Sequence, residues 1–104
     1  MYKQMSLVVL LMSFSTLAFS EEYIVEQKGK VFSVKQLSIK VGDTVSFPNN
    51  DPFYHNVFSY SGTKKFDLGS YKKGDTRKVT FNKPGVIEVE CAIHPKMHMT
   101  INVE

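Results

Sequence analysis

The residues that could do chemistry together lie close to the carboxyl-terminal end of the sequence. A cysteine, a histidine and two methionines follow one another there: Cys91, His94, Met97 and Met99. Cys91 ends an alternating apolar run, so its sulfur is predicted to point into the core at the end of a strand. Pro95 then stops the strand and turns the chain. A thiolate, an imidazole and a thioether that converge across such a tight loop suit a soft metal ion, and copper above all.

Such a site needs one more nitrogen ligand, because two histidines and a cysteine with a distant axial methionine form the arrangement diagnostic of blue, or type 1, copper. His55 is the candidate, since it follows the turn sequence 49–52 and opens the apolar run 57–60. It is therefore predicted to sit at a strand end. The remaining histidine, His98, is predicted to point away from the side that Met97 and Met99 face. From the residues alone, either methionine can be the axial ligand.

Short apolar segments divided by turn-forming residues make up most of the sequence. After residue 20, apolar and polar residues alternate in the segments 37–41, 45–47, 79–81, 87–91 and 101–103. Gly, Pro, Asn and Asp residues separate them, as in sequences whose strands are joined by tight turns. No part of this region carries a sustained helical period. The pattern predicts an all-β chain, an antiparallel sandwich or barrel of about seven strands.

The first twenty residues are typical of a secretory signal peptide. Lys3 supplies the positive charge, residues 7–14 the apolar stretch and residues 18–20 a small-x-small cleavage site. We expect cleavage between Ser20 and Glu21, which leaves residues 21–104 as a single domain. The apolar stretch is shorter than the roughly 20 residues that a membrane span needs, so no span is expected after removal. Retention of the segment as an anchor is the alternative.

The composition indicates which partners the protein could bind and whether it could form a disulfide. The formal net charge of +3 falls by one when Lys3 is removed, and the sequence has a single arginine, so nucleic-acid binding has little support. The lysine pairs 64–65 and 72–73 could steer an acidic partner. A single cysteine excludes an internal disulfide. In an oxidising compartment this thiol must pair with another chain, stay free or bind a metal.

Two short motifs resemble those of a known family. His55-Asn56-Val57, followed by Cys91-x-x-His94-Pro95-x-Met97, is similar to the small cupredoxins, among them plastocyanin, pseudoazurin and most closely amicyanin. The resemblance implies a Greek-key β-sandwich and one-electron transfer in the periplasm. It also implies that His55, Cys91 and His94 are the equatorial copper ligands and that Asn56 ties the two ligand loops together by hydrogen bonding.

The spacing within the second motif bears on the axial ligand. The Cys-x-x-His-x-x-Met spacing resembles the short loop of amicyanin and implies Met97, whereas the loop of plastocyanin and pseudoazurin, longer by two residues, would select Met99. Two features depart from the family. Residues 21–104 form a short chain for it, which allows for the loss of a peripheral strand, and Tyr54 stands where other members often carry proline.

These expectations combine into one predicted function with rivals. The chain is predicted to be an exported, monomeric, non-enzymatic copper protein that docks transiently with a redox partner, a cytochrome or dehydrogenase, through an apolar patch of Ile93, Pro95 and Phe53 around His94. A periplasmic copper carrier or storage protein without electron transfer is the alternative. A Cys-His enzyme is disfavoured because Cys91 faces inward and no oxyanion-hole motif is present. Structural zinc is disfavoured because zinc has no use for a thioether.

Overall fold

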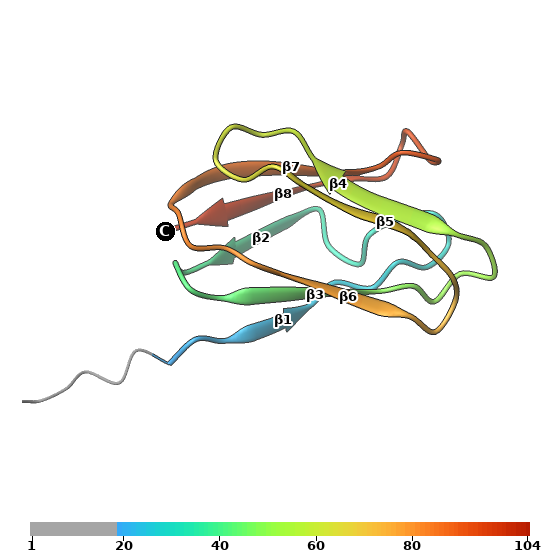
Figure 1. The fold of residues 1–104 in the computed structure, drawn as a ribbon, viewed down its shortest axis with the longest axis horizontal. Coiled ribbons are helices and arrows are strands. Elements are labelled where there is room, and N and C mark those ends of the chain that lie inside the picture. Colours follow the sequence, from blue (N-terminus) through green and yellow to red (C-terminus); the bar gives the residue numbers. More distant parts are fainter. Residues whose placement is uncertain (1–18) are drawn as a thin grey trace, which may run out of the picture.

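The computed structural model describes residues 19–104, which form eight β-strands and no helix (Figure 1). The strands are β1 (Glu22–Ile24), β2 (Gln36–Ile39), β3 (Thr44–Pro48), β4 (His55–Ser59), β5 (Phe66–Tyr71), β6 (Thr76–Thr80), β7 (Gly85–Cys91) and β8 (His98–Val103). They build a three-stranded sheet, β1-β3-β6, and a five-stranded sheet, β2-β8-β7-β4-β5, which face each other as a sandwich. The predicted all-β sandwich is confirmed, with eight strands rather than about seven.

The chain passes repeatedly from one sheet to the other, so most neighbouring strands are not consecutive in the sequence. β1 pairs with β3 and β2 pairs with β8 in parallel, and the other pairs are antiparallel. The crossovers that join β3 to β4 and β5 to β6 are those expected of a Greek-key sandwich. They bring β4 beside β7, and hence His55 close to Cys91.

Two of the strands, β1 and β5, lie outside both the segments in which apolar and polar residues alternate and the apolar run 57–60. β1 has three residues, of which only Tyr23 packs against the core while Ile24 is 67% exposed, so the strand is too short to show a pattern in the sequence. β5 contains Gly69 in a left-handed conformation (φ 70°) and pairs with β4 across a register shift between Asn56 and Phe58. Both features break the period of two on which the prediction depends.

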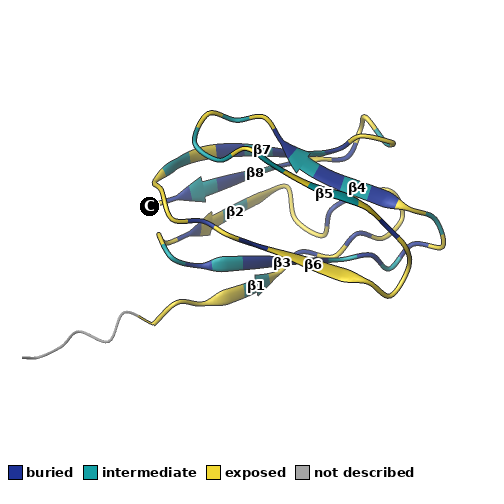
Figure 2. Cartoon of the chain, in the orientation of Figure 1, coloured by how far each residue is buried: buried dark blue, intermediate teal, exposed yellow. Residues whose placement is uncertain are grey.

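The core lies between the two sheets. Its buried apolar residues include Val45, Phe47, Val57, Val79, Phe81, Ile87, Val89, Met99 and Ile101. Figure 2 shows buried positions on the strands where the sheets face each other and exposed positions along β1 and β6. Full burial of each large apolar side chain stabilises the fold by roughly 1.5–3 kcal/mol. Val41, expected on the buried face, instead lies in the turn after β2 and is 46% exposed, because that strand ends at Ile39.

The loops that carry the predicted ligands meet at one end of the sandwich. In Figure 1 the β7–β8 loop and the segment that enters β4 lie at the right, whereas the described chain begins and ends at the left. The predicted signal peptide lies almost entirely outside the described residues. Among those residues, no helix is long and apolar enough to cross a membrane.

Candidate metal centre

Three of the predicted ligands converge at the end of the β4–β7 pair. His55 opens β4 and Cys91 closes β7, and the pairing of Val57 with Cys91 sets them close together. Cys91 Sγ lies 3.5 Å from Nδ1 of His55 and 3.7 Å from Nδ1 of His94. The donor atoms of all three lie within 4.8 Å of one another, with His55 and Cys91 buried and His94 half-buried. One thiol sulfur and two imidazole nitrogens around a common point fit copper.

Main-chain hydrogen bonds tie the two ligand-bearing loops together at Asn56. Its N–H points at Cys91 Sγ over 3.4 Å, and its carbonyl oxygen accepts from the N–H of Ala92 at 3.0 Å. The tie expected from Asn56 is therefore present, but it is made by the main chain. The side-chain Oδ1 of Asn56 is buried and has no partner among the described residues.

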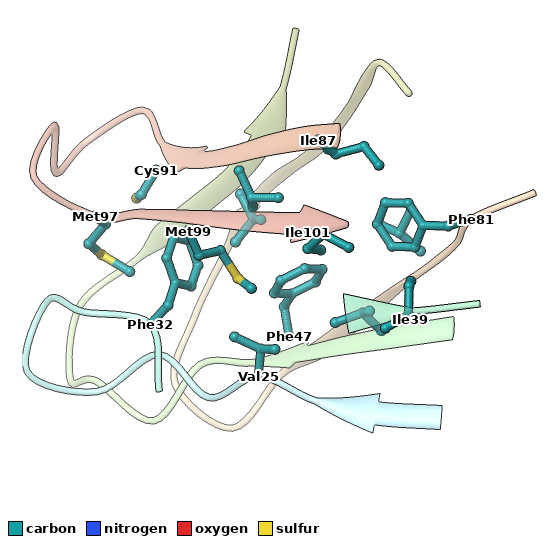
Figure 3. Packing of buried hydrophobic residues seen from close by; sticks show 14 of the residues in the cluster. Val25, Phe32, Ile39, Phe47, Phe81, Ile87, Cys91, Met97, Met99 and Ile101 are labelled. Atoms are coloured by element: carbon teal, nitrogen blue, oxygen red, sulfur yellow. The ribbon is translucent and has the colours of Figure 1, made fainter. Parts of the chain in front are cut away.

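The two candidate methionines occupy different places. Met97 lies in the loop itself: its N–H donates to the carbonyl of His94 at 2.9 Å, and its carbonyl accepts from the N–H of Cys91 at 3.4 Å. Both Met97 and Met99 are fully buried. Figure 3 shows Met97 at the same end of the core as Cys91, whereas Met99 lies further along β8 toward the middle of the core. Of the two methionines, Met97 is therefore the one that lies at the same end of the core as the candidate metal ligands.

The outer edge of the His55 ring is held by a buried carboxylate, Asp51, whose role was not predicted from the sequence. Asp51 Oδ2 lies 2.7 Å from Nε2 of His55. The same carboxylate accepts from the N–H of Gly29 at 2.7 Å and of Lys30 at 3.1 Å. An ionised carboxylate only accepts, so Nε2 carries the proton and Nδ1 is left free toward Cys91. The only feature of the sequence that could have indicated this role of Asp51 is its position, four residues before the candidate ligand His55.

The electrostatics of Asp51 suit this role. Burial by itself would raise the pKa of the carboxyl group, but hydrogen bonds from His55, Gly29 and Lys30 outweigh it and lower the pKa below its usual value. The group is therefore ionised at neutral pH and available as an acceptor for the imidazole.

A phenylalanine separates part of the centre from solvent. The Phe53 ring packs against both imidazoles, with centroids 5.3 Å from His55 and 5.1 Å from His94. Desolvation, assisted by the nearby His55 and Lys30, lowers the pKa of His94, and the Asp51 charge opposes this effect. A lowered pKa keeps the His94 imidazole neutral at neutral pH, the form that can bind a metal.

A shallow groove of about 440 Å³ opens beside His94. It is lined by Gly29, Lys30, Val31, Ile93, His94, Pro95 and Lys96. Ile93 and Val31 are 51% and 56% exposed, so the groove presents apolar side chains to solvent. The predicted members Ile93 and Pro95 line it, whereas Phe53, whose ring packs against that of His94, is not among the lining residues.

Two features of this groove were not predicted from the sequence. The 29–31 loop, far from the ligands in the sequence, forms one wall of the groove because Asp51 anchors it. The lysines that line the groove are Lys30 and Lys96, and the pairs 64–65 and 72–73 are not among the lining residues.

Comparison with known proteins places the chain in a family. Residues 22–104 match the family described as copper binding proteins, plastocyanin/azurin family, and the chain belongs to it. It is 28% identical to the methylamine utilization protein MauL of Methylorubrum extorquens, over 94% of this chain and 87% of that protein. It is 32% identical to amicyanin-alpha of the same organism and 31% identical to amicyanin of Paracoccus denitrificans, each over 70% of this chain. The matches span 64% and 58% of those two proteins.

Solved structures agree with this assignment. A methionine-to-alanine variant of amicyanin in the Cu(I) state has a TM-score of 0.74 and 27% identity, with 80% of this chain and 82% of that chain covered. A copper-containing nitrite reductase from Thermus scotoductus has the same TM-score at 32% identity, but only 22% of that chain is covered. The predicted cupredoxin fold and copper cofactor are confirmed, and the roles of individual ligand residues stay predictions.

Proposed function

We propose that the protein carries single electrons between redox partners through one copper ion held by His55, Cys91 and His94, with Met97 as the axial ligand. The observation that supports this most strongly is the meeting of one sulfur and two imidazole nitrogens within 4.8 Å at the edge of a closed core. Copper bound there would supply the one-electron change between Cu(I) and Cu(II).

The chain's own residues would bind and orient the ion and exclude water. Asp51 holds the proton of His55 on Nε2, so Nδ1 remains a ligand. The N–H of Asn56 points at the sulfur of Cys91 and would donate a hydrogen bond to it while it holds the ion. Because strands β4 and β7 fix these two residues, little rearrangement of the protein is needed when the charge of the site changes.

We also propose that the protein works in the periplasm after removal of residues 1–20, leaving the domain 21–104. Two features of the sequence support this proposal. Residues 1–20 are typical of a signal peptide. The single cysteine cannot form an internal disulfide, and binding to a metal would protect its thiol in an oxidising compartment.

Electrons would enter and leave through the half-buried ring of His94, the ligand that borders the groove. The groove is small and flanked by exposed Ile93, which suits a brief encounter of a monomer with a cytochrome or dehydrogenase better than a permanent interface. Lys30 and Lys96 on its walls would favour an acidic partner surface and give an association rate that falls with salt.

The main alternative is a carrier that delivers copper to another protein. A carrier must release its ion, and a ligand set with Cys91 2% exposed and His55 fully buried offers little access for a competing ligand. This observation favours electron transfer. We propose no catalytic role, and the match to the nitrite reductase, which covers 22% of that chain, does not support one.

The proposal is tested with Ile93→Glu in a stopped-flow series against a periplasmic cytochrome. A charge at the mouth of the groove should slow electron transfer several-fold and leave the optical spectrum unchanged. Val86→Glu is the matched control, because Val86 is 53% exposed on β7 and does not line the groove. Parent-like rates for Ile93→Glu would place the exit elsewhere, and transfer of the copper ion itself to the partner would favour the carrier.

A further inference from the structure

We propose that Asp43 is a binding site for the amino group that signal cleavage creates at Glu21, so that processing itself locks the first strand into the fold. This inference rests on the proposed export of the protein. The site lies at the opposite end of the sandwich from the metal centre, where β1 and β3 begin at the left of Figure 1.

The main-chain nitrogen of Glu21 already faces this carboxylate. It lies 2.9 Å from Asp43 Oδ1, and Asp43 is only 3% exposed. The other carboxylate oxygen, Oδ2, accepts from the N–H of Lys40 at 2.8 Å. The carbonyl of Glu21 accepts from the N–H of Thr44 at 2.9 Å. Both main-chain groups of Glu21 are therefore bound by the turn that leads into β3.

The hydrogen-bonded chain starts at the residue that cleavage would make first. Glu22 pairs with Thr44 as the first pair of the parallel β1–β3 ladder. Phe19 and Ser20 are exposed, and among the described residues Glu21 is the first whose main chain is bonded to the sheet. The hydrogen-bonded fold therefore begins immediately after the Ser20–Glu21 bond.

Cleavage changes the chemistry of this contact. Hydrolysis consumes one water and leaves a carboxylate on Ser20 and an amino group on Glu21, which is protonated at neutral pH. A neutral amide donating one hydrogen bond becomes an ammonium beside a buried carboxylate, and charge-assisted hydrogen bonds are roughly twice as strong as neutral ones. Cleavage one residue earlier would move the charge about 3.3 Å along the chain, away from Asp43.

The neighbouring charges permit this pair. The Glu21 side chain accepts from the Tyr23 hydroxyl at 3.0 Å and adds a second negative charge that favours the ammonium. Lys40 is the positive charge on the same turn and opposes it. Hydrogen bonds from the main-chain N–H groups of Glu21 and Lys40 lower the pKa of Asp43, so its carboxylate is ionised at neutral pH.

The interaction is tested with three forms of copper-loaded protein that differ only at the amino terminus: one starting at Glu21, one starting at Ser20 and one starting at Nα-acetylated Glu21. We expect the first to melt about 4–8 °C higher than the other two at pH 7. The same forms with Asp43→Asn should melt together. The proposal would be overturned if the three forms with Asp43 melted at the same temperature. It would also be overturned if the three Asp43→Asn forms differed in melting temperature as much as the parent forms do.

The pH dependence provides a second readout that needs no variant. The carboxylate raises the folded-state pKa of the ammonium above its ordinary value of about 8. The stability advantage over the acetylated form should therefore be complete between about pH 5 and 7, where both groups are charged, and disappear as the pH rises through the raised pKa. An advantage that persists above pH 11 would contradict an ion pair.

The role in processing is tested separately by the amino-terminal mass of protein exported to the periplasm. A mature chain that starts at Glu21 supports the proposal. A different start, found together with the expected melting behaviour, would leave the amino-group site standing and overturn its link to processing. Failure of export would instead count against the proposed function.

Discussion

The carboxylate of Asp51 lies 2.7 Å from Nε2 of His55, on the ring edge opposite the nitrogen that faces Cys91. The same carboxylate holds the 29–31 loop through two main-chain N–H groups. A buried ligand and one wall of the groove beside His94 are therefore fixed by a single side chain.

Replacement Asp51→Asn should lower the affinity for copper by about 10–100-fold, because the imidazole of His55 loses the ionised acceptor that fixes its orientation and tautomer. Competition with a chelator of known affinity measures the change. Asp75→Asn is the control, since Asp75 is exposed in the β5–β6 turn. Equal affinities for the parent and Asp51→Asn would show that the main chain alone orients His55.

The two buried methionines should respond differently to substitution. Met97→Gln should shift the reduction potential markedly, since a proposed axial ligand is replaced, whereas Met99→Leu should leave the potential unchanged and lower the free energy of unfolding by less than about 1.5 kcal/mol. Protein-film voltammetry and urea unfolding measure the two quantities. A shifted potential in Met99→Leu with none in Met97→Gln would assign the axial role to Met99.

Tyr71 supports the core beneath the centre through its hydroxyl group. The hydroxyl donates to the carbonyl of Phe47 at 2.7 Å and accepts from Nε2 of Gln27 at 2.7 Å. Burial raises the pKa of Tyr71 to about 12, so the donor is retained over the physiological range. Tyr71→Phe leaves these buried groups short of a partner and should cost about 1–3 kcal/mol of unfolding free energy in urea denaturation.

The matched control for this substitution is Tyr60→Phe, because Tyr60 is 75% exposed. It should change the unfolding free energy by less than about 0.5 kcal/mol. A Tyr71→Phe protein as stable as this control would show that the Gln27 amide and the Phe47 carbonyl find other partners.

The parts of the fold and site that the sequence predicted are those set by local pattern. Alternation in β7 was enough to turn Cys91 inward, and it is 2% exposed. His98, expected to face away, is exposed, and its ring contacts the carboxylate of Glu88 on the outer face of the sheet. Loop spacing favoured Met97, which lies at the same end of the core as Cys91, and its axial role stays a prediction.

The features that sequence reasoning missed depend on contacts between distant segments. Asp51 meets Gly29 across 22 positions, and no local period marks either residue. Whether His55 faces Asp51 or solvent is likewise set by the β3–β4 turn and by the loop packed over it. Strand β1 is stabilised by parallel pairing with β3 and by no apolar alternation of its own.

The most direct test of the proposed centre is the absorption and EPR spectrum of copper-loaded protein comprising residues 21–104, compared with Cys91→Ser. The parent should bind one copper ion and show an intense visible band from charge transfer between the thiolate and Cu(II), with the EPR signal of a type 1 site. Cys91→Ser should lose that band. A parent protein without the band, or a Cys91→Ser protein with an unchanged spectrum, would contradict the assignment of Cys91 as a copper ligand.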